Sequence, residues 1–142
     1  MKYLEAGGRV TWIGDAPFFY QSHSNGTVTE WGTLGALNLL GVDIKIWDSN
    51  ATTSQITPEG LTWGMRLPNY ATSQRPATKE SVTTILAVVE GYASSWEKNL
   101  NADYPNSGFI CYSYANYDGT DNLRNRDVVN LSTVPFELEM IK

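Results

Sequence analysis

The chain has 142 residues, of which 42% are hydrophobic and 18% charged, and its formal net charge is −5. This composition excludes a disordered chain, and the length favours one folded domain over residues 1–142. There is no cluster of Lys or Arg, so we expect no nucleic-acid partner. No apolar run is long enough for a transmembrane helix, and residues 1–7 lack the apolar core of a signal peptide, so we expect no membrane partner and leave the compartment open.

The first third of the chain begins with the end of a helix. Residues 2–6 are predicted as its last turn, which the following pair of glycines closes. The continuously apolar Val10–Ile13 predicts a strand buried on both faces. Residues 16–29 contain no Asp, Glu, Lys or Arg and include turn-forming residues, which predicts a long loop.

The middle of the chain combines a helix with a long polar stretch. Apolar residues recur at helical spacing from Trp31 to Leu40, and Gly41 is placed to end that helix. The alternation over Val42–Trp47 predicts an edge strand. Residues 48–79 are rich in Thr, Ser, Pro and Asn and are predicted as an insertion loop with a short strand at Leu61–Arg66.

The last part of the chain shows two further apolar runs and a helical pattern. The predicted elements are a buried strand at Val82–Val89, a short helix at Ala93–Leu100, a strand at Gly108–Tyr114, a helix from Asp121 to about Ser132, and a strand or tail at 134–141. Strands that alternate with helices predict an α/β fold, specifically a Rossmann-like layered domain with a mostly parallel sheet and helices on its faces.

The segment YLEAGGRVTWIGD resembles one found in class I glutamine amidotransferase-like domains, where a helix ending in Ala-Gly-Gly leads into a central strand. WGTLGALNLLGV, TTILAVVEGYASSWEKNL and SGFICYSY then follow in a similar order. Trehalose-utilisation-like proteins and the trimerisation domain of some β-galactosidases show this order as well. The chain resembles the second half of such a domain, which implies a fragment of a larger one.

The catalytic pair of that family is not matched. Its enzymes carry a nucleophilic Cys on a sharp strand-to-helix turn and a His later in the chain. Here Cys111 falls inside a predicted strand without flanking glycines, and the single histidine, His23, precedes it. The resemblance therefore implies a non-catalytic accessory or assembly module associated with carbohydrate-active proteins, which self-associates or belongs to a larger parent protein.

Asp15 and Glu90 carry the alternative of a glycoside hydrolase. Each carboxylate follows a predicted buried strand, so a parallel sheet would bring both to one edge. Glycoside hydrolysis requires two carboxylates about 5 to 10 Å apart. The more common role of such residues is to accept hydrogen bonds in a turn or cap a helix.

Aromatic side chains in predicted loops carry a third hypothesis, a free-standing carbohydrate-binding protein. Sugar rings stack on exposed aromatic rings. The two alternatives are that these aromatic side chains pack in the core of the domain or that they are buried in a subunit interface. We expect no metal site and no cofactor, because one His and one Cys cannot form an ordinary zinc site and the glycine-rich nucleotide motifs are absent. The candidate ligand-binding residues are Tyr20, Trp63, Tyr70 and Tyr92.

Overall fold

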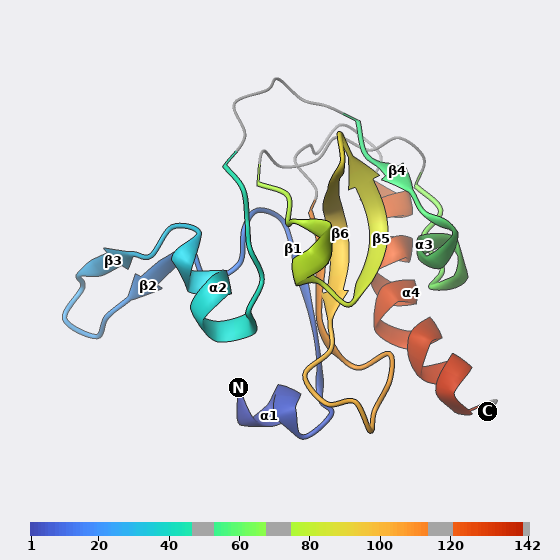
Figure 1. The fold of residues 1–142 in the computed structure, drawn as a ribbon, viewed down its shortest axis with the longest axis horizontal. Helices are drawn as coiled ribbons and strands as arrows, with labels where there is room; N and C mark the ends of the chain where they lie inside the picture. The colour runs from blue at the N-terminus through green and yellow to red at the C-terminus, as the bar shows by residue number, and fades with distance from the viewer. Residues whose placement is uncertain (47–52, 68–74, 114–120, 141–142) are drawn as a thin grey trace.

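The computed structural model describes residues 1–46, 53–67, 75–113 and 121–140, and its centre is a mixed five-stranded sheet (Figure 1). Only β1 and β7 run parallel, and every other neighbouring pair is antiparallel. In the order in which they pair, the strands are β1 (Arg9–Ile13), β7 (Gly108–Tyr112), β6 (Tyr92–Lys98), β5 (Thr84–Val89) and β4 (Gln55–Ile56).

The expected mostly parallel, Rossmann-like sheet is therefore wrong. Its error lies at residues 93–100, which were predicted as a helix and instead belong largely to β6. A tight turn at Glu90 and Gly91, with φ values of 42° and 86°, reverses the chain and pairs β6 with β5. Positive φ at both central residues is typical of the two-residue turns that join antiparallel strands. The result is a hairpin where a parallel crossover was expected.

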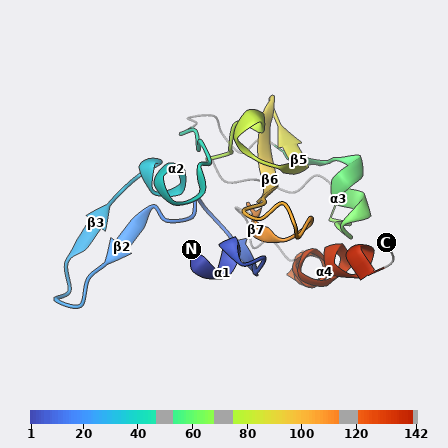
Figure 2. The same cartoon turned by 60° about the horizontal axis from the view of Figure 1, so that its bottom comes forward.

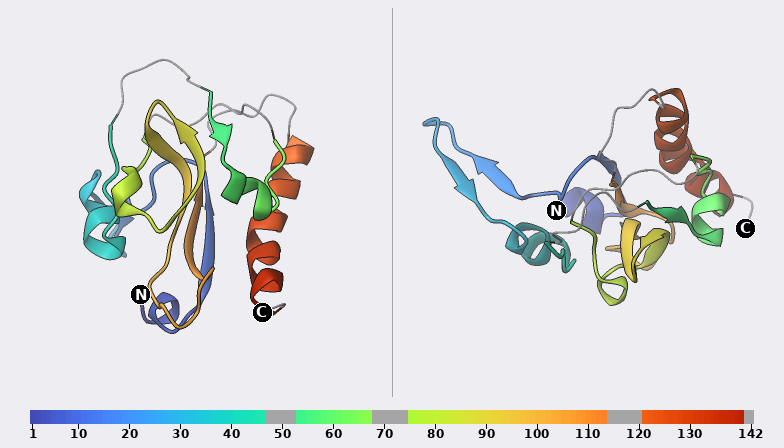
Figure 3. Two further views of the ribbon diagram at one scale, coloured as in Figure 1. Left: turned by 45° about the vertical axis from the view of Figure 1, so that its right-hand side comes forward. Right: turned by 90° about the horizontal axis from the view of Figure 1, so that it is seen from above.

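Two apolar clusters lie on opposite faces of the sheet. Side chains alternate along β7, so Phe109 and Cys111 join one cluster while Ile110 and Tyr112 join the other. The first cluster includes buried residues of α1 (Lys2–Glu5) and α2 (Leu34–Leu40). The second includes Leu131 of α4, and Figure 3 shows α2 and α4 on either side of the sheet.

β1 is an edge strand. The expectation that it is buried on both faces is wrong, because Trp12 and Ile13 are 38% and 46% exposed. The strand instead contacts α1, β7 and α4, and its apolar side chains pack in part against these elements. The helix end before it is confirmed as α1, and Gly7 follows with φ of 88°.

Residues 16–29 do not form the expected loop. Strands β2 (Tyr20–Ser22) and β3 (Val28–Glu30) pair as an antiparallel hairpin. In its turn, the Asn25 side chain accepts a hydrogen bond from the N–H of Thr27 at 3.0 Å, and Gly26 has φ of 84°. We call residues 20–30 the hairpin arm; it projects away from the main sheet in Figures 1 and 2.

The expected helix after the arm is confirmed as α2, and Gly41 ends it in the left-handed conformation. The edge strand expected at Val42–Trp47 is reduced to a single bridge between Ile44 and Ala77, and Trp47 lies outside the described residues.

The predicted insertion loop contains regular structure. The short helix α3 (Pro58–Thr62) is capped by the Thr57 side chain, which accepts a hydrogen bond from the N–H of Gly60 at 3.1 Å. The strand expected at Leu61–Arg66 is therefore wrong. A single 3₁₀ turn, η1 (Lys79–Ser81), follows closer to β5.

The long C-terminal helix α4 (Asp121–Met140) confirms the helix expected from Asp121 and extends well beyond it. Residues 134–140 are thus helical, not a strand or tail. The carboxylate of Asp127 fastens α4 to residues 66–67, whose two N–H groups donate to it at 2.7 and 3.0 Å. None of the described helices is long and apolar enough to cross a bilayer.

Candidate functional site

The hairpin arm and α2 line a cavity of about 400 Å³ that is open to solvent on one side, and we call it the hairpin–helix cavity. Its wall is mainly apolar and aromatic, with two side-chain amides as polar groups. The lining residues are Phe18, Tyr20, Gln21, Trp31, Gly35, Asn38 and Leu39.

Close backbone packing builds this cavity. A Cβ atom at Gly35 would lie 1.9 Å from the carbonyl oxygen of Phe18, so only glycine allows α2 to approach this segment. The N–H of Trp31 donates to the carbonyl of Phe19 at 2.9 Å. Its indole N–H donates to the side-chain oxygen of Gln21, also at 2.9 Å, which fixes the ring between the arm and the helix.

An aromatic series links the cavity wall to the core of the sheet. The Phe18 ring lies 5.4 Å from that of Phe109 and 6.3 Å from that of Trp12, and Phe109 lies 6.0 Å from Trp96. Phe18 itself has φ of 60°, which is unusual for a bulky residue. Contacts on both sides hold it there, so the wall of the cavity is supported by buried packing.

Asp15 stabilises the base of the arm. Its carboxylate pairs with the guanidinium of Arg75 and accepts a hydrogen bond from the N–H of Ala16 at 2.7 Å. Arg75 in turn lies 4.4 Å from the centre of the Phe19 ring, a cation–π distance. These contacts give Asp15 a structural role in positioning the segment that enters β2.

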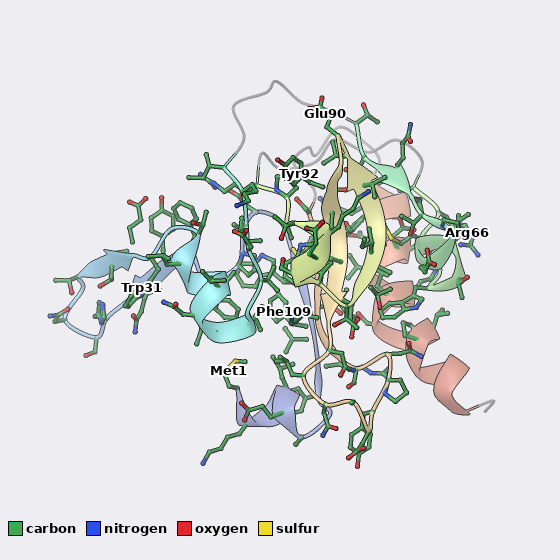
Figure 4. The ribbon with its side chains drawn as sticks, in the orientation of Figure 1. Met1, Trp31, Arg66, Glu90, Tyr92 and Phe109 are labelled. Carbon is green, nitrogen blue, oxygen red and sulfur yellow. The ribbon has the colours of Figure 1, made fainter. Side chains whose placement is uncertain are left out.

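The structure does not bring Asp15 and Glu90 together. β1 and β5 are separated by β7 and β6, and three steps of about 4.8 Å put these strands about 14 Å apart. Glu90 is exposed in the turn between β5 and β6, at the top of Figure 4.

The predicted ligand-binding aromatics are scattered as well. Tyr20 is 62% exposed and lines the hairpin–helix cavity, whereas Trp63 is only 4% exposed and packs in the core cluster beneath α4. Tyr92 is half-buried on β6, away from Trp31 in Figure 4. Tyr70 lies outside the described residues.

Cys111 and His23 also lie apart. Burial, with the negative charge of Asp15, raises the pKa of the Cys111 thiol above its usual range. His23 lies in the turn of the hairpin arm, where a ring nitrogen is 2.8 Å from the hydroxyl of Thr29. Among the described residues, no group of three His, Cys, Asp or Glu side chains could hold a metal ion.

The sequence predicts Tyr20 as a ligand-binding residue. It does not single out the two side-chain amides, Gln21 and Asn38, or the other α2 residues that line the cavity. Two patterns could have revealed them. Between Asp15 and Asp43 the only charged residue is Glu30, and the apolar residues of 31–40 occupy more of the helix than one buried face requires. Leu34, at 54% exposure, belongs to that surplus.

Comparison with curated proteins found no match, and comparison with solved structures found none either. The model of the MJECL34 family matches residues 1–133, a span that includes the sheet, the hairpin arm and the cavity. The chain therefore belongs to the MJECL34 family.

Proposed function

We propose that this chain is a non-catalytic module that assembles with a protein partner through an exposed apolar surface beside the cavity. We call it the hairpin–helix surface, and each of its side chains is at least 44% exposed. Its members are Tyr20, Val28, Trp31, Leu34, Leu37 and Leu39.

The chemistry of this surface is the observation that carries the proposal. Patches of exposed apolar side chains mark interaction sites on proteins, and all six members of this surface lie within residues 20–39. Interface centres are depleted in charge and enriched in Trp and Tyr. Residues 16–42 contain one charged side chain, Glu30, and contribute both Tyr20 and Trp31. The surface thus has the composition of an interface, although much of it faces solvent in the isolated chain.

The residues that suggested catalysis have roles that support a non-catalytic module. The Asp15 carboxylate is engaged by Arg75 and by the N–H of Ala16, so it supports the fold of the arm. The thiol of Cys111 is 3% exposed, and its raised pKa keeps it protonated at neutral pH. A protonated, buried thiol is a poor nucleophile.

Site-specific cross-linking in the native host tests the proposal. A photoreactive benzophenone amino acid replaces Leu37 on the surface or, as a matched control, Leu61 on α3, which is 49% exposed. We expect a discrete cross-linked species from position 37 and none from position 61. Absence of any species at position 37, with the chain folded, would refute the proposed function.

A second candidate function is saccharide binding in the hairpin–helix cavity. The cavity combines exposed aromatic rings with the amide of Asn38, and such groups bind the faces and hydroxyls of sugars. Titration with a broad glycan panel should then change the Trp fluorescence of the wild type, and Trp31→Phe should remove the change. Silence across the panel would reject this candidate.

A further inference from the structure

We propose that the partner is a second copy of this chain, packed about a two-fold axis so that each hairpin arm lies against α2 of the other copy. The inference rests on the proposed function and identifies the occupant of the hairpin–helix surface. It is carried by the shape of the arm, by the distribution of charge and by the size of the surface.

The shape of the arm calls for a partner that covers it. β2 and β3 have three residues each, and only Thr29 among them is half-buried. A two-stranded hairpin without further packing is marginally stable in water. In a two-fold arrangement, one contact would cover the arm of one copy and the exposed leucines of α2 in the other. The same contact, repeated by symmetry, would cover both surfaces of both copies.

The distribution of charge favours a second copy over a basic partner. Each chain has a formal net charge of −5, so two copies repel each other in general. Residues 16–42 carry only Glu30, which makes this segment a place where two acidic chains can meet with little like-charge repulsion. A basic partner would find a single carboxylate there and would gain little electrostatic attraction.

The segment that carries the hairpin–helix surface offers more exposed residues than the six apolar members of that surface. Sixteen of the residues from 16 to 42 are exposed. A standard interface uses roughly 20 to 30 residues from each partner. In this arrangement the remaining contacts come from residues outside 16–42.

Sedimentation equilibrium and light scattering on the purified chain test the inference. The variants are Leu37→Glu on α2 and Val28→Lys on the arm, with Leu61→Glu on α3 as the matched control; all three positions are at least 44% exposed. Circular dichroism and thermal unfolding check that each variant folds. We expect the wild type and Leu61→Glu to show twice the chain mass of 15.8 kDa. Each surface variant should raise the dimer dissociation constant by about 30-fold.

Two outcomes would overturn the second copy as partner. One is a wild type that stays monomeric up to about 200 µM, a concentration far above the Kd of ordinary stable dimers. The other is a dimer that Leu61→Glu weakens as much as Leu37→Glu. If cross-linking at position 37 then gives a species of another mass, the proposed function stands with a different partner. If position 37 also gives no species, both fail.

Discussion

Replacing Glu97 by Gln should stabilise the folded chain above pH 7. Glu97 lies on β6 with 1% of its surface exposed, and neither carboxylate oxygen accepts a hydrogen bond of normal geometry from the described residues. Burial raises its pKa from 4.5 to about 7, and the Thr84 side chain and the charge of Lys98 offset only part of this effect. The folded protein therefore holds this proton more tightly than the unfolded chain does.

The sign and size of the effect follow from that difference. Below about pH 4.5 the carboxyl group is protonated in both states and does not affect the free energy of unfolding. Between about pH 4.5 and 7 the unfolded chain ionises this group while the folded chain keeps it protonated, so stability falls by about 3 kcal/mol and levels off above about pH 7. Gln has nearly the same shape and does not titrate. The variant should thus be more stable by up to about 3 kcal/mol above pH 8, or about 10 °C in Tm.

Urea unfolding followed by Trp fluorescence at several pH values between about 4 and 8 measures this difference. The matched control is Glu80→Gln, because Glu80 is exposed on η1. The Glu97→Gln curve should lie close to the wild type near pH 4 and above it near pH 8. Equal stability of the two proteins across this range would show that Glu97 is ionised with a compensating partner, and would refute the reasoning.

Five further substitutions at four positions test the packing around α4, the cavity and the base of the hairpin arm. Asp127→Ala leaves the two N–H donors of residues 66–67 unpaired and should cost about 3 kcal/mol in urea unfolding, whereas Asp127→Asn, which keeps one acceptor oxygen, should cost less. Gly35→Ala forces a Cβ against the Phe18 carbonyl and should lower Tm strongly, while Ala at the open turn position Gly26 should cost about 1 kcal/mol. Arg75→Gln removes a partly exposed ion pair and should cost about 1 kcal/mol or less, with an effect that shrinks in high salt.

The elements that sequence analysis located share strong apolar patterns with clear ends. β5 and β7 are short apolar runs, and most of their side chains are buried or half-buried on both faces. They can therefore be recognised as strands from their own sequence, without knowing which strands they pair with. α2 combines helical spacing with a left-handed glycine cap at Gly41. In each case the local pattern and the tertiary environment demand the same conformation.

β6 shows why the topology could not be predicted. Its sequence, YASSWEK, has neither alternation nor a continuous apolar run, because it is buried between β5 and β7 with small serines and one carboxylate inside. The turn before it offers Glu90 and Gly91, where Asn-Gly would have indicated a hairpin directly. Tertiary pairing decided the conformation, and once β6 is a strand the sheet cannot be mostly parallel.

The same error explains the separation of the two candidate catalytic carboxylates. In a parallel sheet with few strands, Asp15 and Glu90 would lie at one edge, close enough to act together. β6 and β7 instead insert between the strands that carry them. The proposed chemistry depended on adjacency of strands, which is a non-local property that apolar runs do not encode.

The lack of charge over residues 16–29 was interpreted as a property of a loop, but the low charge continues to residue 42, and this longer pattern was the most informative one for the site. A solvent-exposed loop, however, gains from charged side chains, because charge keeps exposed surfaces soluble and separate. Residues 16–42 expose Trp31 and Tyr20 but contain only one charged side chain, Glu30. This segment therefore lacks the charges that keep exposed surfaces soluble and separate. In a free monomer this surface would be an aggregation liability, whereas in an assembly it is the part that must be uncharged. A second copy packed on these 27 positions, as proposed above, would supply the packing that the arm lacks on its own and would cover its exposed aromatic rings.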